Sequence, residues 1–289
     1  DIVLTDDNFA SIGSAIEEGR RMFANIQKFV LHLLAQNVAQ ACVLLIGLAF
    51  KDHTGLSVYP LSPVEILYVI MVTTGLPAMG LGMELAAPDI MEQKPNTSRL
   101  GIFSLEMLAD LLAYGLWMAA LCLGTYSLVV FRWGDGELGD NCNDKYNDSC
   151  DTVYRGRGAT FIVITWFSLF LAWEVTNMRR SFFRMSHTAH WYNQWLVDTW
   201  KNKFLFSCVV LGFFSVFPIV YIPGLNKVVF QHKGAEGWEW GIVFVATLMF
   251  FLGIEFYKWV KRAYLRRLAH RKDENTLHIV SHEQGSEEA

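Results

Sequence analysis

The chain has 289 residues, of which 53% are hydrophobic and 14% aromatic, and its formal net charge is −4. Apolar residues gather in long runs, a pattern that argues against an ordinary soluble protein and for a membrane protein. The sequence shows no phosphate-binding glycine loop, zinc-ligand spacing or nucleophile motif, so we expect no catalytic residue and no nucleic-acid binding in it. It starts at Asp1 without a signal peptide, which we interpret as a fragment of a larger polypeptide.

The first 50 residues predict one long helix. Apolar residues recur at helical spacing from Phe9 to Val30, and no proline interrupts positions 9 to 50. Residues 5–8 offer N-cap side chains, and the preceding "DIVL" is typical of the end of a buried strand. We therefore expect residues 1–28 to be the end of a soluble domain and a cytoplasmic stalk helix, which then enters the membrane.

Residues 29–260 predict a membrane domain with six spans, each close to the ~20 residues that cross a bilayer core. The spans are Phe29–Phe50, Val64–Leu85, Met107–Phe131, Ala159–Asn177, Phe204–Ile222 and Trp240–Val260. Most of the 24 Lys and Arg residues fall on the side of residues 1–28, so that side is predicted to be cytosolic. The expected fold class is an all-α six-helix transmembrane bundle with a long stalk helix. The tail, residues 261–289, is basic and then aperiodic, which predicts disorder.

The loop between the third and fourth spans contains two cysteines. Cys142 and Cys150 lie in the polar stretch "GDNCNDKYNDSC", on the side that the charge bias places outside the cytosol. Thiols there can oxidise, so the two cysteines are candidates for a disulfide. Asn147 begins an Asn-Asp-Ser triplet and is a candidate for glycosylation.

The first span carries three amide side chains within five positions. Gln36, Asn37 and Gln40 can share one flank of a helix, because i,i+3 and i,i+4 residues are neighbours on its surface. Amides in a span can join helices by hydrogen bonds or line a polar cavity. Three on one flank favour the cavity, and we predict that they contribute to a cation site.

The second span predicts a helix break at Gly75 and Pro77. Pro77 cannot donate to the helix ladder, so carbonyl groups between Ile70 and Thr74 are expected to lose their partners. Thr73 and Thr74 add hydroxyl oxygens at the same depth. Oxygen ligands at a broken helix suit a monovalent cation. The alternative is a proline kink in which the threonines bond back to the helix.

Glu174 lies inside the fourth span, shortly before Arg179 and Arg180. A carboxylate in a membrane span is a functional-site candidate, so Glu174 is a candidate for the negative charge of the cation site. An ion pair with one of the two arginines explains it equally well.

Two stretches resemble a known family. "DIVLTDDNFASIGSAIEEGRRMFANIQKF" is similar to the segment of P-type cation ATPases that leaves the phosphorylation domain and becomes the fifth transmembrane helix. "VTTGLPAMGLGMELAAPDIM" resembles the sixth helix and the loop after it. The resemblance covers the whole chain, and "NVAQA", "LSPVEIL", "FPIVYIPGLNKVVF" and "LAWEVTNMRRSFFRM" are most similar to the fungal sodium-exporting type. It implies an ATP-driven exporter of Na+, with K+ or Li+ as further candidates.

The resemblance also implies site residues. Relative to calcium pumps of the family, Asn37 and Gln40 take the places of an asparagine and a glutamate ligand. Thr73 keeps a threonine, Thr74 replaces an aspartate, and the eighth-helix glutamate falls on Met178. Few acids remain, which argues against Ca²⁺ and fits a weakly held monovalent ion.

Close relatives are expected to carry a glutamate where this sequence has Gln36. The family's D-K-T-G phosphorylation motif, hinge motif and fourth helix do not occur in this sequence, so the resemblance places ATP and Mg²⁺ in upstream domains and implies that the fragment alone is inactive. The implied partners are membrane lipid and its own N-terminal half, in the plasma membrane or alternatively the endoplasmic reticulum membrane. Rival interpretations are a secondary carrier or channel without ATP and a non-catalytic truncated scaffold.

Overall fold

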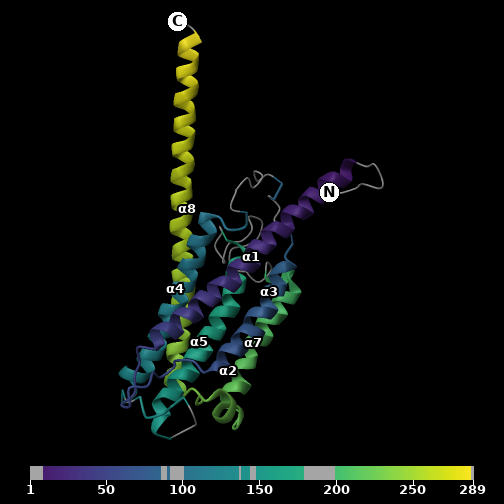
Figure 1. Cartoon of the computed structure of the whole chain (residues 1–289). Coiled ribbons are helices and arrows are strands. Elements are labelled where there is room, and N and C mark those ends of the chain that lie inside the picture. The colour runs from purple at the N-terminus through teal and green to yellow at the C-terminus, as the bar shows by residue number, and fades with distance from the viewer. Residues whose placement is uncertain are drawn as a thin grey trace.

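The computed structural model describes residues 9–85, 90–91, 101–136, 138–143, 148–178 and 199–287. Within these ranges the chain is helical, apart from turns and one isolated bridge between Lys51 and Ser57. Six stretches of helix in the described part of the chain are long and apolar enough to cross a membrane, which confirms the predicted all-α bundle (Figure 1). The predicted strand end, the N-cap residues 5–8 and the glycosylation candidate Asn147 lie outside the described residues.

The first helix, α1, spans Phe9–Gly47 and confirms the prediction of one continuous helix. Its N-terminal half projects away from the bundle of the other spans (Figure 1). Two side chains tie it to the end of the second span: Arg20 Nη1 donates to the Ile90 carbonyl at 2.9 Å, and Asn25 Nδ2 donates to the Glu84 carbonyl at 2.8 Å. The stalk and the first membrane span are therefore one continuous helix, whose stalk part is bonded to the end of the second span.

The second span consists of three short pieces, α2 (Pro63–Tyr68), the π-helical turn η1 (Val69–Thr74) and α3 (Gly75–Gly82). Its start is set by a capping box, in which Ser62 Oγ accepts from the Glu65 amide at 3.2 Å and Glu65 Oε2 accepts from the Ser62 amide at 2.7 Å. Pro63 fits the first helical position, where no N–H is needed.

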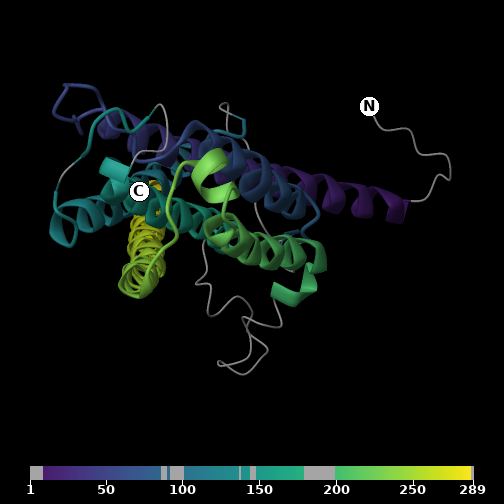
Figure 2. The ribbon, with the colours of Figure 1, turned by 90° about the horizontal axis from the view of Figure 1, so that it is seen from below.

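The remaining spans are α4 (Leu105–Ser127, extended by η2, Leu128–Arg132), α5 (Asp151–Thr176, after the 3₁₀ turn η3, Asp148–Cys150), α7 (Lys203–Tyr221, followed by η4, Leu225–Phe230) and α8 (Gly237–Glu287). Helix α5 is buried along nearly its whole length between α1, α4, α7 and α8 (Figures 1 and 2). A helix that is apolar all round belongs in such a position.

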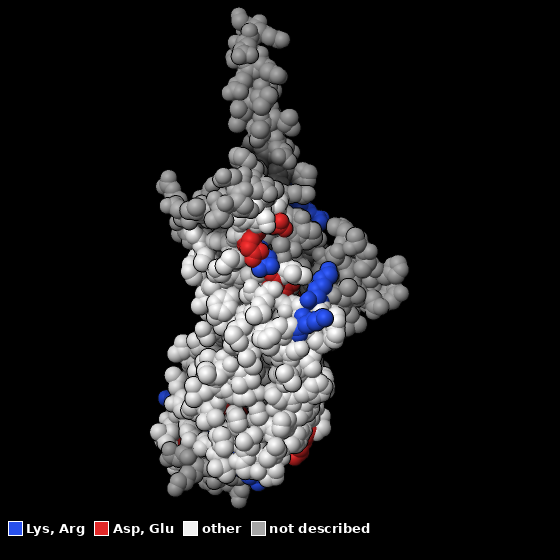
Figure 3. Space-filling model, turned by 90° about the vertical axis from the view of Figure 1, so that its right-hand side faces the viewer, with Lys and Arg blue, Asp and Glu red and all other residues white. Residues whose placement is uncertain are grey.

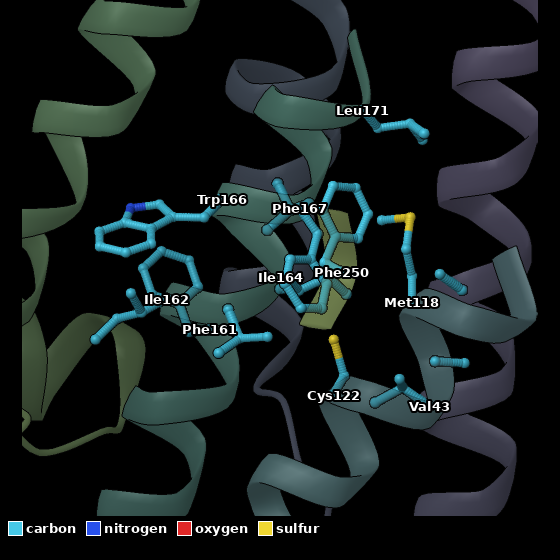
Figure 4. Close-up of a cluster of buried hydrophobic side chains, with 14 of the residues drawn as sticks. Val43, Met118, Cys122, Phe161, Ile162, Ile164, Trp166, Phe167, Leu171 and Phe250 are labelled. Atoms are coloured by element: carbon cyan, nitrogen blue, oxygen red, sulfur yellow. The ribbon is translucent and has the colours of Figure 1, made fainter. Parts of the chain in front are cut away.

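Aromatic side chains fill the space around α5. The Phe167 ring stacks on Phe250 of α8 with centroids 4.6 Å apart, and Trp166 stacks on Phe213 of α7 at 4.5 Å. Figure 4 shows the first pair, with Trp166 pointing to the other side of α5. The outer surface is apolar too: one face of the bundle has a broad middle zone almost without charged residues (Figure 3). Such a zone matches the hydrocarbon core of a membrane.

The end of the bundle opposite the stalk is held by a disulfide and a buried arginine. Cys142 and Cys150 are joined by a disulfide with Cα atoms 5.7 Å apart. Arg157 is 1% exposed and donates to the Tyr59 carbonyl at 2.9 Å and the Cys142 carbonyl at 3.1 Å. In the loop before α2, a hydrogen bond from the Thr54 hydroxyl, helped by backbone amides, lowers the pKa of Asp52.

The tail differs from the sequence expectation. Composition predicted a basic segment followed by disorder within residues 261–289, whereas the structure continues α8 as a helix to Glu287 (Figure 1). The physical reason is local: residues 261–287 contain no proline and many strong helix formers such as Lys, Arg, Leu, Ala and Glu. A segment without apolar periodicity has no apolar face to pack against other helices. It can still be helical when it continues an existing helix, because nucleation is the costly step of helix formation.

Candidate functional site: a polar layer at a helix break

The second span is interrupted where the sequence predicts a break. The Gly75 amide donates to the Ile70 carbonyl, five residues back, so the chain makes one π-helical turn before α3 begins. The Ile70 carbonyl, which was expected to lose its partner, is therefore bonded. The reason is that in a π turn a carbonyl accepts a hydrogen bond from the amide five residues later instead of four.

Thr73 and Thr74 are buried at this turn, 0% and 2% exposed. Both hydroxyls donate to the Val69 carbonyl, at 2.8 Å and 3.0 Å. This is the back-bonded arrangement that the sequence left open as the alternative. It does not remove the oxygens as ligands, because a hydroxyl that donates its hydrogen keeps lone pairs that can accept or coordinate.

The three amides of α1 do not share one flank, contrary to expectation. Gln36 is 0% exposed and Gln40 is 5% exposed, whereas Asn37 lies on the exposed side of the helix. Successive helical residues are ~100° apart, so Asn37 turns away from the stripe formed by Gln36 and Gln40. Both amide atoms of Gln36 and Nε2 of Gln40 are buried without a hydrogen-bond partner among the described residues. Buried amides normally have a polar partner, so these atoms are available to one.

Gln36 lies at the depth of the helix break. The marker is Asn25 of α1, which donates to the Gly82 and Glu84 carbonyls at the end of α3. Gln36 lies eleven residues after Asn25 on α1. Because consecutive spans run in opposite directions, it is level with the residue about eleven positions before Gly82 and Glu84 on the second span, which is about residue 72. The two helices are packed against each other. Gln36, Thr73 and Thr74 therefore lie at about the same depth on two packed helices, and we call this set the amide–hydroxyl layer.

His32, one turn before Gln36, fixes this part of α1 against α5. Its side chain is 0% exposed, and Nε2 lies 3.0 Å from the Ser168 carbonyl, so the ring donates there. His32 was not among the predicted site residues. The available signal was the i,i+4,i+8 series His32, Gln36, Gln40, which places all three on one stripe.

Glu174 is engaged elsewhere. Lys258 Nζ of α8 lies 2.5 Å from Glu174 Oε2 and 2.8 Å from the Glu174 carbonyl, and both side chains are 0% exposed. Glu174 lies six residues beyond Ser168, about 9 Å along α5 on the side away from Gln36. It does not reach the amide–hydroxyl layer. Its partner is Lys258 of α8. Arg179 and Arg180, the two partners that the sequence suggested, lie outside the described residues.

The other buried carboxylates of the spans are also paired within the described part of the chain. They bond to basic side chains at distances of 2.5–2.7 Å: Glu65 to His232, Asp110 to Lys261, and Glu239 to Arg155. Met178, the other candidate position, packs against the main hydrophobic core. The oxygens that remain at the break are therefore neutral amide and hydroxyl oxygens. Such a set suits a singly charged ion better than Ca²⁺, which takes several carboxylates.

Comparison with known proteins accounts for this arrangement. Residues 58–260 match the family model "Cation transporting ATPase, C-terminus". The chain is 51% identical over 278 residues to "Sodium/potassium exporting P-type ATPase 5" of Saccharomyces cerevisiae, which is 96% of this chain and 25% of that protein. It is 45% identical to the exporter cta3 of Schizosaccharomyces pombe over 91% of this chain, and 27% identical to "Calcium-transporting ATPase 1" of Bacillus cereus over the same share.

The chain spans about a quarter of the length of these relatives, and the matched segments cover 25–27% of them. The family model reaches from the loop before α2 to the last membrane-spanning part of α8. The resemblance seen in the stalk and in the "TTGLP" break is thus confirmed over nearly the whole chain. This multi-pass membrane chain belongs to the cation-transporting ATPases and corresponds to the C-terminal part of that family.

Proposed function

We propose that the chain is the C-terminal membrane half of an ATP-driven exporter of monovalent cations, Na⁺ first and K⁺ or Li⁺ as alternatives. The observation that carries the proposal is the amide–hydroxyl layer: Gln36 has buried, unpartnered amide atoms at the same depth as the buried hydroxyls of Thr73 and Thr74. The names of the fungal relatives support the choice of ions. Neutral oxygens replace part of the hydration shell of such an ion and hold it weakly enough to let it go.

In the complete protein, ATP and Mg²⁺ bind in domains upstream of this chain, and α1 connects them to the layer. Asn37 faces outward from the described bundle. An amide is costly in lipid, so this side of α1 is where the N-terminal half of the same protein packs. Lipid covers the apolar outer faces, and the plasma membrane is the location that suits an exporter.

The coupling follows from the continuity of α1. No break interrupts the helix between its cytoplasmic half and Gln36, and an α-helix rises ~1.5 Å per residue. A tilt or rotation of the stalk therefore moves Gln36 relative to η1. Because the oxygens of η1 are anchored to the Val69 carbonyl, such a movement changes the distance between the two halves of the layer.

The test uses the full-length protein and measures phosphoenzyme formation from ATP as a function of Na⁺ and K⁺ concentration. Gln36→Leu and Thr74→Val each remove an oxygen at nearly constant volume. We expect each to raise the half-saturating ion concentration about tenfold, the equivalent of ~1.4 kcal/mol. The matched control is Thr125→Val in α4, a buried hydroxyl that bonds back to the Leu121 carbonyl and should leave the ion dependence unchanged.

Two results would overturn the proposal. A full-length protein whose phosphorylation does not respond to any monovalent cation would favour the carrier or scaffold interpretation. Ion dependence that is equal in wild type, Gln36→Leu and Thr74→Val would move the site away from the amide–hydroxyl layer.

A further inference from the structure

Thr165 in the middle of α5 is a buried hydroxyl with an unusual environment. Its side chain is 0% exposed, and Oγ1 has no hydrogen-bond partner among the described residues. The neighbouring hydroxyls of the same helix behave differently: Thr160 donates to the Gly156 carbonyl at 2.8 Å and Ser168 to the Ile164 carbonyl at 2.7 Å. Back-bonding of this kind is the usual way to satisfy a hydroxyl in a span. The Thr165 oxygen is left for a ligand.

Two contacts show which way Thr165 faces. Phe161, one turn earlier on the same stripe, packs its ring against Tyr68 at the end of α2, with centroids 5.5 Å apart. Ser168, three residues later, accepts from His32 of α1. Thr165 lies between these two contacts on the surface of α5. It therefore faces the seam where η1 and α1 meet α5, which are mutual neighbours.

The same contacts give its depth. Spans two and four run in the same direction, so four residues beyond the Phe161–Tyr68 contact Thr165 is level with residues 72–73 of η1. Span one runs the opposite way, so three residues before the Ser168–His32 contact Thr165 is level with residues 35–36 of α1. Both estimates place Thr165 at the amide–hydroxyl layer.

We infer that Thr165 supplies the fourth span's oxygen ligand to the transported monovalent cation, completing a layer shared by α1, η1 and α5. The inference rests on the proposed function and adds a residue to its site. It also assigns the role of α5 to a hydroxyl in the middle of the helix instead of the carboxylate of Glu174, which lies about 13 Å further along the axis and is held by Lys258.

The chemistry fits a small hard cation. A threonine oxygen is a neutral oxygen donor of the type already present at Thr73 and Thr74. With Thr165, buried oxygens come from three neighbouring helices at one depth, so that an ion bound among them would be enclosed without a net negative charge. A buried hydroxyl without a partner is unfavourable, and ion binding would recover that cost.

The experiment compares three variants of the full-length protein in the same phosphorylation assay. Thr165→Val keeps the shape and removes the oxygen, and we expect it to raise the half-saturating Na⁺ concentration about tenfold. Thr165→Ser keeps the oxygen and loses a methyl group, and we expect a change of less than about twofold. Thr160→Val removes a hydroxyl of equal burial that is already bonded, and it should behave as wild type.

This set separates a ligand from a packing residue. If Thr165 only fills space, Thr165→Ser should be the more harmful variant and Thr165→Val the milder one. That order, or a wild-type ion dependence in Thr165→Val, would overturn the inference. The proposed function survives this result as long as Gln36→Leu still weakens the ion response, so the two failures can be told apart.

Discussion

Lys258→Met should destabilise the chain much more than the loss of a comparable exposed lysine. Lys258 and Glu174 are both 0% exposed, whereas the ion pair of Lys233 with Asp151 at the other end of the bundle is 36% and 43% exposed. Removing one partner of a buried pair typically costs about 3–5 kcal/mol, because the other charge remains in a medium of low dielectric constant. An exposed pair contributes about 0–1 kcal/mol.

We therefore expect Lys258→Met to lower the free energy of unfolding by about 3–5 kcal/mol and Lys233→Met to lower it by less than about 1 kcal/mol. The assay is denaturant titration of the chain in detergent micelles, followed by helical circular dichroism. The double variant Glu174→Gln/Lys258→Met removes both charges and should recover most of the loss, since no charge is left buried alone. Asp151→Asn/Lys233→Met is the matched control and should show no such coupling.

The dependence on pH provides a second check. A proton on Glu174 neutralises the carboxylate that Lys258→Met leaves behind, so the loss of stability in this variant should shrink as the pH falls. The reasoning would be refuted by a Lys258→Met variant that is as stable as Lys233→Met at pH 7. In that case Glu174 would not depend on Lys258, and its exclusion from the cation site would lose its basis.

Two further predictions concern packing and covalent structure. A Cβ at Gly115 of α4 would lie 2.7 Å from Val38 Cγ1 and 3.0 Å from the Ala35 carbonyl of α1, so Gly115→Ala should lower the free energy of unfolding by about 1–3 kcal/mol. Gly124 on the same helix has nothing within 4 Å, so Gly124→Ala should leave it unchanged or raise it by up to ~1 kcal/mol. Equal effects of the two variants in the same titration would contradict the close approach of α1 and α4. Cys142 and Cys150 should resist labelling by a membrane-impermeant thiol reagent until they are reduced, and immediate labelling in intact cells would defeat the disulfide.

The long-helix prediction succeeded because its signals are local. Apolar spacing and the absence of proline over residues 9–47 are sufficient to predict α1, and the structure shows one helix there. The break at Gly75 and Pro77 is local too, since a proline acts on the turn before it. The form of the break is a π turn that keeps the Ile70 carbonyl bonded. The sequence does not predict this form, because the same residues are compatible with a π turn and with a proline kink that leaves carbonyls unbonded.

The amide cluster shows where sequence reasoning stops. Helical geometry gives the angles between Gln36, Asn37 and Gln40, but it does not say which neighbouring helix covers which angle. In the structure, Gln36 and Gln40 are buried and Asn37 is exposed. Likewise, Glu174 and Lys258 are 84 residues apart, and the sequence around either residue does not predict their contact. Pairings of this kind depend on tertiary packing, which spacing along one helix does not encode.

The charged pairs and the neutral layer occupy different depths, and the division has a mechanical consequence. Three buried ion pairs join α5 and α4 to α8 near the ends of the spans: Arg155–Glu239, Glu174–Lys258 and Asp110–Lys261. The contact of Glu65 with His232 joins α2 to the loop after η4. Residues 29–47 of α1 contain no Asp, Glu, Lys or Arg, and hold α5 through the His32–Ser168 hydrogen bond. A hydrogen bond contributes about 0.5–1.5 kcal/mol, less than a buried pair costs to break. The membrane part of α1 packs closely on α4 at Gly115 but takes part in no ion pair among the described residues. In the proposed coupling, α1 can therefore move Gln36 against the oxygens of η1 and α5 without breaking a buried ion pair.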